Sequence, residues 1–324
     1  MTDSSAVSDV QAQYEALPSP PRDPREEAIR LITGTPSHIL EINHYLFAGR
    51  LNFNRPFRAL VAGGGTGDAC IMLAQQMADR HCPGEVVYLD LSAASRAICE
   101  GRAKARSLRN VQFLSGSLLD LPNMNLGQFD YIDCTGVLHH LPDPVAGIKA
   151  LASVLQPEGG MGVMLYGEYG RSGVYQLQEI LRTLAPTSMA TEDRLAMARR
   201  LIRFLPTTNL FRRNAYLNDH VTGGDAGLYD LLLHSCDRAY TVPQIGELTA
   251  AAGLRVVAFL EPVRYEPATY MSDPVIARQA SSLPLLERAA FAERLAGNLR
   301  THVFYATRAG YDTVARPEDT QAIP

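Results

Sequence analysis

A glycine-rich turn between two apolar segments constrains the fold of this chain more than any other feature. The run from Phe57 to Ala62 predicts a buried parallel strand, because it is apolar at every position except Arg58 rather than alternating. Residues 69–74 then have the pattern of a helix. Gly63, Gly65 and Gly67 lie between them, where a missing Cβ lets a ligand lie against the backbone. The amides of the following helix can face an anionic group, although a tight turn without a ligand explains the same pattern.

The segments after this turn alternate between strand and helix patterns. Short apolar runs end near residues 90, 114, 134 and 166, with helical patterns at 93–107 and 145–155 between them. This alternation predicts an α/β fold with a Rossmann-like, doubly wound sheet that is mostly parallel. Two late apolar runs, 254–259 and 301–307, are expected to complete the sheet, and helical insertions interrupt it.

Changes of pattern along the chain predict its organisation. The proline-rich run from Leu17 to Pro24 predicts a loose arm over residues 1–24. A helical pattern covers 26–47, broken at 34–36, and Ser37 is expected to cap its second helix. The expected parts are an N-terminal arm with cap helices (1–50), a cofactor-binding core (51–170), a mainly helical insertion or lid (171–245), the end of the core sheet (246–310, with a helical insertion at 261–300) and a flexible tail (311–324).

Composition narrows the class of protein. The net charge of −4 gives no support to nucleic-acid binding. No apolar stretch approaches the roughly 20 residues that a membrane-spanning helix needs. The five cysteines have no paired metal-ligand spacing, which fits reduced thiols, and the polar N-terminus lacks a signal-peptide pattern. We therefore expect a cytoplasmic protein with no nucleic-acid partner and no membrane partner.

One carboxylate stands where a ribose-binding residue is expected. Asp90 follows the second predicted strand, at the carboxyl edge of the sheet. A carboxylate there can accept two hydrogen bonds from ribose hydroxyls. Capping of the next helix is the alternative interpretation, although Ser92 is an equally good cap.

Taken together, these segments resemble the class I S-adenosylmethionine-dependent methyltransferases, strongly over residues 57–167 and weakly over the last two strands. The His-His-Leu stretch is the most specific match and is similar to the type 11/12-like subgroup that includes the ubiquinone-pathway methyltransferases. The resemblance implies S-adenosyl-L-methionine as the cofactor. The features that carry it are Gly63-x-Gly65-x-Gly67, Asp90, Asp120 in a Ser-Leu-Leu-Asp-Leu-Pro segment, Phe129 to Ile132, Val137 to Pro144 and Leu155 to Gly160.

Two positions bear on this resemblance. Many family members have an acidic residue two positions before the first motif glycine, where this chain has Val61. The amino group of the cofactor's methionine must therefore be bound by something other than a carboxylate at this position, and backbone contact at Ala62 and Gly63 could suffice. The competing analogy is a nicotinamide dehydrogenase, whose fingerprint has a third glycine where this chain has Asp68. That carboxylate would repel a pyrophosphate, which S-adenosylmethionine lacks.

The resemblance also implies which residues contact the cofactor. The three motif glycines are expected against its backbone, Asp90 at the ribose and Asp120 at the adenine amine. Thr135 and Gly136 are expected on the methionine side. The full expected set is Ala62, Gly63, Gly64, Gly65, Gly67, Asp90, Leu91, Ser117, Leu119, Asp120, Thr135 and Gly136.

The acceptor side is less defined by the sequence. A phenol or alcohol acceptor would benefit from a general base near neutral pH, which suits histidine. The expected catalytic candidates are His139, His140, His44, Tyr45 and His220. Packing at the start of the next helix is the alternative for the first two. A metal site from His139, His140, His220 and His234 has no supporting ligand spacing, so no metal is expected.

Methyl transfer also requires a cover over the acceptor pocket, because water must be excluded. Two segments are candidates: the helix with His38 and Glu41, and the stretch 218–234. We expect at least two acceptor-facing residues among His44, Tyr45, Asp219, His220 and His234, whereas docking of the insertion is the alternative. The predicted function is methyl transfer from S-adenosylmethionine to a small-molecule acceptor. A protein side-chain acceptor and a non-catalytic nucleotide-binding or scaffold protein stay open.

Overall fold

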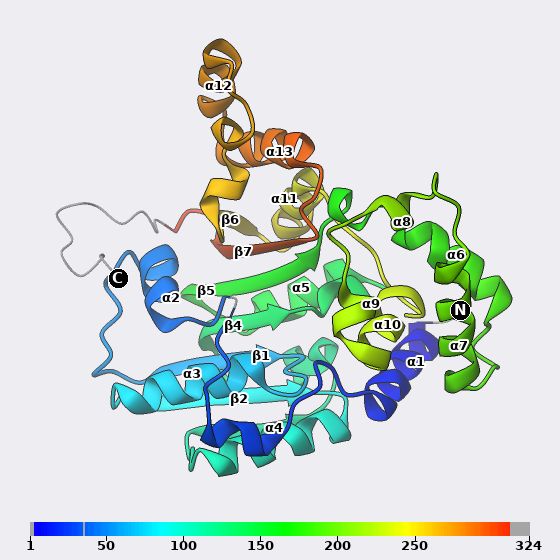
Figure 1. Ribbon diagram of the computed structural model, residues 1–324. Helices are drawn as coiled ribbons and strands as arrows, with labels where there is room; N and C mark the ends of the chain where they lie inside the picture. Colours follow the sequence, from blue (N-terminus) through cyan, green and yellow to red (C-terminus); the bar gives the residue numbers. More distant parts are fainter. Residues whose placement is uncertain (1–2, 35, 312–324) are drawn as a thin grey trace.

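The computed structural model describes residues 3–34 and 36–311 and is built around one seven-stranded sheet (Figure 1). The strand order is β3-β2-β1-β4-β5-β7-β6, and β7 runs antiparallel to both of its neighbours, whereas the other pairs are parallel. This confirms the predicted Rossmann-like sheet with a late antiparallel strand. The strands are β1 (Phe57–Ala62), β2 (Gly84–Asp90), β3 (Val111–Ser115), β4 (Phe129–Thr135), β5 (Leu155–Tyr166), β6 (Leu254–Phe259) and β7 (Thr301–Arg308).

Helices cover both faces of the sheet, which is why its central strands are mostly apolar. One face packs against α2 (Ile39–Phe47), α3 (Asp68–Asp79) and α4 (Ala93–Ala105). The other face packs against α5 (Pro144–Ser153) and α11 (Val242–Ala250). Near β6, α13 (Leu285–Ala296) continues this layer, and α12 (Pro274–Ser281) projects from it (Figure 1).

The segment after β5 forms a helical subdomain with an apolar core of its own. It lies beside the carboxyl ends of the parallel strands, to which the arrowheads in Figure 1 point. Buried Arg194 joins its helices by donating to the carbonyl oxygens of Ala185 and Leu233. Its helices are α6 (Val174–Leu184), α7 (Thr191–Arg203), α8 (Leu210–Arg213), α9 (Asp219–Thr222) and α10 (Gly224–Leu232).

The N-terminal region differs from its prediction. Residues 3–16 form a helix, α1 (Asp3–Ala16), so the loose arm is wrong there. The helical pattern of 26–47 is also only partly right, since a 3-10 turn at Pro24–Ala28 precedes an irregular stretch before α2. His38, rather than Ser37, is the N-cap residue of α2. The Ser37 hydroxyl instead donates to Asp133 at 2.5 Å, a long-range contact that no local pattern reveals.

A buried ionic network fastens this N-terminal region to the core. The Glu27 carboxylate accepts from Arg102 Nε at 2.6 Å and from Arg106. Arg102, which is 0% exposed, also donates to Asp68 at 2.7 Å and to the carbonyl oxygen of Thr66. The network therefore links the N-terminal segment directly to the glycine turn.

The histidine pair lies in a 3-10 turn, Leu138–His140, rather than at the start of α5 as predicted. The helix begins at Pro144 because Asp143 accepts from the amides of Val145 and Ala146, a stronger start signal. The predicted flexible tail falls almost entirely on residues 312–324, which lie outside the described residues. In the part of the chain that the structure describes, no helix has both the length and the apolar character needed to cross a membrane.

Candidate active site

A cavity of about 510 Å³ opens at the carboxyl ends of the central parallel strands. One wall is the glycine turn between β1 and α3, and another is the end of β2. The cavity brings together most of the residues predicted to contact the cofactor. Those that line it are Gly63, Gly64, Gly65, Gly67, Asp90, Leu91, Ser117, Thr135 and Gly136.

The turn requires glycine for reasons of protein packing as well as ligand access. Gly63 has a φ of 73°, and a Cβ there would lie 2.3 Å from Val137 Cγ2. Gly67 has a φ of 103°, and a Cβ there would lie 2.3 Å from Cys99 Sγ. Both residues adopt the left-handed region that glycine favours. These two glycines are therefore required by the close packing of the turn against Val137 and Cys99, whether or not a ligand is bound.

Asp90 connects the end of β2 to this turn. Its Oδ2 accepts from the Gly65 amide at 2.7 Å, and its Oδ1 accepts from the Ser92 amide at 2.8 Å. Burial raises the pKa of Asp90, against the opposing effect of these backbone donors. Ser92 caps α4 through the Ser95 amide, so the helix does not need Asp90 as its cap. Contact of Asp90 with a ribose stays a prediction.

Three predicted cofactor residues do not line the cavity. Ala62 is buried within β1, and Asp120 is exposed on the 3-10 turn Leu118–Asn123. Leu119 lies on the same turn, whose cavity-facing residues are Ser117 and Leu118. The structure therefore does not place the Asp120 carboxylate where the adenine amine was expected.

The N-terminal segment covers the cavity, which the sequence interpretation missed. Ser19 and Pro20 line it, and Thr66 Oγ1 donates to the Pro20 carbonyl oxygen at 2.8 Å. Arg22 also lines it and binds the Asp68 carboxylate through two donors, at 2.6 and 2.8 Å. Residues 19–22 thus lie across the glycine turn.

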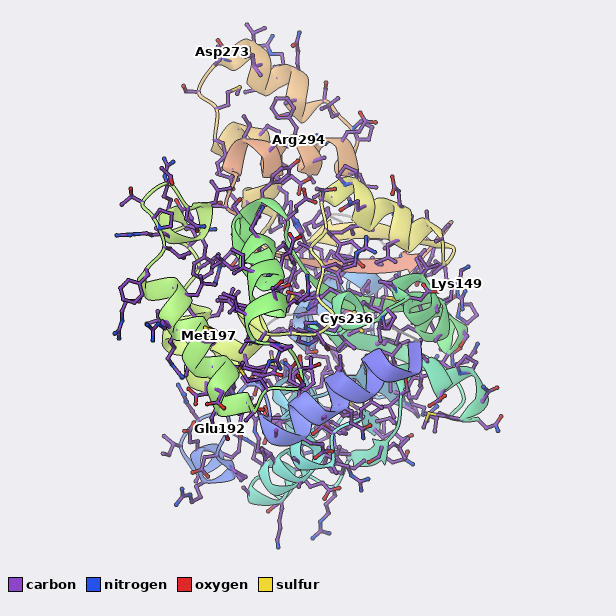
Figure 2. All side chains as sticks on the ribbon, turned by 90° about the vertical axis from the view of Figure 1, so that its right-hand side faces the viewer. Lys149, Glu192, Met197, Cys236, Asp273 and Arg294 are labelled. Atoms are coloured by element: carbon purple, nitrogen blue, oxygen red, sulfur yellow. The ribbon has the colours of Figure 1, made fainter. Side chains whose placement is uncertain are left out.

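Helix α1 continues this cover beyond the turn. The Gln11 side chain donates from Nε2 to the Leu91 carbonyl oxygen at 3.1 Å, and the Glu15 carboxylate accepts from the backbone amides of Ala93 and Ala94 at the start of α4. Figure 2 faces this side of the molecule, with α1 in front of the core. The cover was missed because Gln11 and Glu15 have the polarity of an ordinary solvated helix face.

We expect this cover to be ordered by ligand binding. Arg22→Gln removes one charge from the contact with Asp68, so protease cleavage within residues 17–24 should become faster than in the wild type. S-adenosylhomocysteine should slow that cleavage in both proteins, because the segment lines the cavity. Limited proteolysis followed by mass spectrometry measures both rates. Cleavage that is unchanged by the ligand would contradict the assignment of this segment as a cover.

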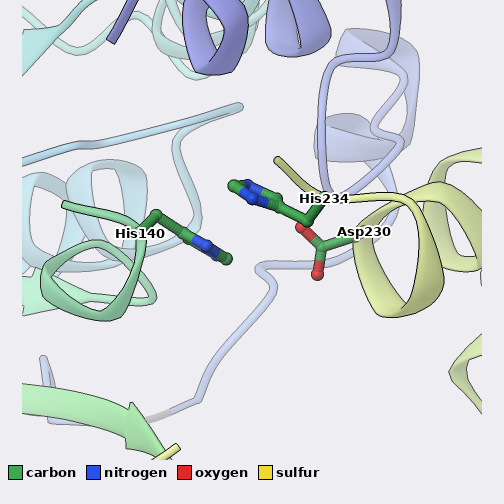
Figure 3. Close-up of side chains that lie close together, drawn as sticks. All are labelled: His140, Asp230 and His234. Atoms are coloured by element: carbon green, nitrogen blue, oxygen red, sulfur yellow. The ribbon is translucent and has the colours of Figure 1, made fainter. Parts of the chain in front are cut away.

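The end of the cavity away from the glycine turn is polar and aromatic. Tyr14, His140, Tyr166 and Asp230 line it. The Asp230 carboxylate accepts from the Tyr14 hydroxyl at 3.1 Å and from the Tyr166 hydroxyl at 2.7 Å. His140 stacks on His234, with ring centroids 3.8 Å apart, and Figure 3 shows these two rings beside Asp230.

The other predicted catalytic residues lie elsewhere. His139 is fully buried and stacks on Tyr166, and burial, followed by the charge on His140, lowers its pKa well below the ordinary value. It is therefore a neutral packing residue. His44 and Tyr45 lie on α2, where Tyr45 stacks on Tyr305.

The predicted cover is therefore wrong for α2 and α9. His220 packs against Phe211, and Asp219 pairs with Arg300 at 3.3 Å. Among the described residues, none of the five expected to face the acceptor lines the cavity. His234 reaches it indirectly, through its stack on His140. The predicted stretch 218–234 does reach the cavity, but through Asp230 of α10, a residue that was not among the five.

Comparison with known proteins agrees with this geometry. Residues 60–161 match the family model described as "Methyltransferase domain". An uncharacterized protein of Synechococcus, syc1184_c, is 30% identical over 276 residues, which cover 81% of this chain and 62% of that protein. Demethylmenaquinone methyltransferase of Geobacillus kaustophilus is 35% identical over 116 residues, covering 36% of this chain and 47% of that enzyme. Ubiquinone biosynthesis O-methyltransferase of Acinetobacter baumannii is 28% identical over 88 residues, covering 27% of this chain and 36% of that enzyme.

Among solved structures, PKMT2 from Rickettsia typhi in complex with AdoHcy has a TM-score of 0.68 at 16% identity, covering 89% of this chain and 55% of that one. This likeness shows the shared fold. The chain spans 62% of the Synechococcus relative and less than half of the two quinone-pathway enzymes. Residues 60–161 are a class I S-adenosylmethionine-dependent methyltransferase domain, and S-adenosylmethionine is the cofactor of this class. Membership of the His-His-Leu subgroup stays a prediction.

Proposed function

We propose that this protein transfers a methyl group from S-adenosylmethionine to a small-molecule acceptor. The observation that carries the proposal is one cavity with two different ends. The glycine turn and Asp90 form one end, and His140, Tyr166 and Asp230 form the other. A cofactor and an acceptor bound at these ends would meet inside a single covered space.

The residues at the first end fit the cofactor. Gly63 and Gly65 present backbone without side chains, and Asp90 keeps a carboxylate at the cavity wall. S-adenosylmethionine supplies an activated methyl group, so the protein has to align the acceptor and exclude water.

Two observations favour a small acceptor over a protein side chain. The cavity volume of about 510 Å³ lies within the range of small-molecule sites. Tyr14 of α1 is bonded to Asp230 of α10, so the cover and the helical subdomain meet over the acceptor end. The names of the two quinone-pathway relatives also support a small-molecule acceptor.

The proposal is tested with methyl-labelled S-adenosylmethionine, the purified protein and a bacterial metabolite extract. We expect label in the small-molecule fraction and none in the protein fraction. Boiled protein and an extract without protein are the controls. Label found only in protein would replace the small acceptor by a protein side chain. Absence of transfer, with cofactor binding intact, would favour a non-catalytic binding protein.

A further inference from the structure

Two histidines at the acceptor end are held in opposite tautomers by the backbone of one residue, Cys236. His140 Nδ1 lies 3.0 Å from the Cys236 carbonyl oxygen, which can only accept, so this nitrogen carries a proton. His234 Nδ1 lies 3.1 Å from the Cys236 amide nitrogen, which can only donate, so this nitrogen presents its lone pair. Neutral His140 therefore has its free lone pair at Nε2, whereas neutral His234 carries its proton there.

Asp230 supplies negative charge beside these rings (Figure 3). Burial raises its pKa, but His140, His234, the Tyr166 hydroxyl and Arg171 act more strongly together, and the net pKa lies below the ordinary value. Burial and then Asp230 raise the pKa of Tyr14 well above its ordinary value, so its hydroxyl stays a donor. A carboxylate held in this way can stabilise a positive charge on the adjacent imidazole.

The same residues could be considered as a metal site. One nitrogen of each ring and one Asp230 oxygen lie within 4.8 Å of one another. The Cys236 amide, however, already occupies the lone pair of His234, and burial, followed by His140, lowers the His234 pKa well below its ordinary value. A neutral imidazole has no second lone pair, so His140 alone offers a free nitrogen ligand. The tautomers thus favour a proton site over a metal site.

We propose that His140 Nε2 accepts the proton of a hydroxyl group on the acceptor, and that Asp230 is the counter-charge of the resulting imidazolium. This inference rests on the proposed function and names its acceptor class. The hydroxyl proton goes to His140, the oxygen lone pair forms the new carbon–oxygen bond, and the carbon–sulfur electron pair stays on the departing sulfur. A hydroxyl needs such help because it keeps its proton near neutral pH, whereas neutral amines and thiolates need little.

The first test does not depend on knowing the acceptor. Nitrogen-15 NMR of the histidine rings in the full protein, saturated with S-adenosylhomocysteine near neutral pH, reports which nitrogen carries each proton. We expect His140 protonated at Nδ1 and His234 protonated at Nε2. A His140 ring protonated at Nε2 would overturn the proposal, because no lone pair would remain at the proposed base.

The second test compares two neighbouring variants. His140→Gln should lower turnover by roughly 10²- to 10⁴-fold, while the affinity for S-adenosylhomocysteine stays within about threefold. His139→Gln is the matched control, which should lose thermal stability and keep its turnover number. Equal losses of turnover in both variants would overturn the proposal, since they would indicate a shared structural role.

The labelled product and the metal content provide the remaining readouts. Digestion and mass spectrometry of the product should place the methyl group on oxygen. A methyl group on nitrogen or carbon, or one equivalent of a divalent metal required for turnover, would overturn the hydroxyl assignment. Failure to transfer any label would instead count against the proposed function, and the NMR result would still decide the tautomers.

A different observation concerns the carboxylate that is missing at Val61. In the sheet, Val61 of β1 is the register partner of Asp133 of β4. Asp133 lines the cavity and is 1% exposed, with the Ser37 hydroxyl donating to it at 2.5 Å. Within residues 3–34 and 36–311, no arginine, lysine or histidine forms a salt bridge with it. A buried carboxylate without a cation, at the wall of a cavity, fits a cationic group of a ligand.

We infer that Asp133 binds the ammonium group of the cofactor methionine, one strand away from the position where many relatives have their acidic residue. Burial raises the pKa of Asp133 to about 6, against the opposing hydrogen bonds from Ser37 and Thr135. Its carboxylate would gain a counter-charge only when the ligand is bound. This inference also rests on the proposed function, through the cofactor that it requires.

The test compares two ligands by titration calorimetry. S-adenosylhomocysteine carries the amino-acid group, whereas 5′-methylthioadenosine lacks it. Asp133→Asn should weaken binding of the first by roughly 10- to 100-fold and leave binding of the second unchanged. The double variant Val61→Asp with Asp133→Asn should recover part of the loss. Equal losses for both ligands, or a loss for neither, would overturn the inference. A wild-type protein that binds neither ligand would contradict the proposed function itself.

Discussion

Asp90→Ala is expected to lower the affinity for S-adenosylhomocysteine by roughly 10²- to 10⁴-fold. The variant should lose two hydrogen bonds from ribose hydroxyls to a charged acceptor, each worth about 1.5–3 kcal/mol. It also frees the amides of Gly65 and Ser92, which Asp90 now holds. The glycine turn should therefore lose part of its order together with its ligand contact. Titration calorimetry on the folded variant measures the effect.

A matched variant separates these two causes. Asp90→Asn keeps one acceptor oxygen for the backbone but removes the charge, so its affinity should lie between those of the wild type and Asp90→Ala. Thermal melting of both variants checks that the sheet is intact. Unchanged affinity in a folded Asp90→Ala protein would falsify the ribose assignment.

The second large effect is expected on stability. Arg102→Met should lower the free energy of unfolding by about 3–5 kcal/mol, because it removes one of the two arginine partners of the buried Glu27 carboxylate and the link from there to Asp68. The Glu27 and Arg102 side chains are each 1% exposed, so water cannot replace the lost contact. Urea unfolding at a fixed protein concentration measures the change.

Arg96→Met is the matched control. The partner of Arg96 is Glu100 on the same helix, α4. Both side chains are more than a third exposed, at 34% and 42%. Such a surface pair contributes about 0–1 kcal/mol to stability, so Arg96→Met should lower the free energy of unfolding by no more than this. If Arg102→Met cost no more than Arg96→Met, the network would not fasten the N-terminal segment as described.

The sheet was predictable because its strands are short and buried on both faces. The run from Phe57 to Ala62 is apolar except at Arg58, and β1 has the same bounds. The prediction was less accurate for β5, whose first residue, Leu155, was predicted to end the preceding helix. Gln156, Pro157 and Glu158 lie at an irregularity of the strand, between the position where Leu155 pairs with Phe129 and the position where Gly160 pairs with Tyr131.

The candidate site was predictable only where one local segment builds it. The glycine turn and Asp90 follow each other across a single strand–helix–strand unit, so their approach follows from the fold. The acceptor end combines Tyr14, His140 and Asp230 from three distant elements. No periodicity relates such positions, and His139 and His140 looked equivalent until burial and the Cys236 contact distinguished them.

Asp133 shows a similar limit. In the sequence it is one of two aspartates in a mostly apolar strand, and only the register between β1 and β4 places it opposite Val61. The N-terminal cover depends in the same way on contacts made far along the chain, such as Glu15 with the amides of Ala93 and Ala94. These long-range contacts are decided by tertiary packing.

The most direct test of the central claim is a crystal structure of the protein with S-adenosylhomocysteine. The ribose should lie at Asp90, and the sulfur should face the end of the cavity formed by His140, Tyr166 and Asp230. Residues 19–22 should cover the ligand. A ligand bound outside this cavity, or one whose sulfur points away from His140, would contradict the account of a single space shared by cofactor and acceptor.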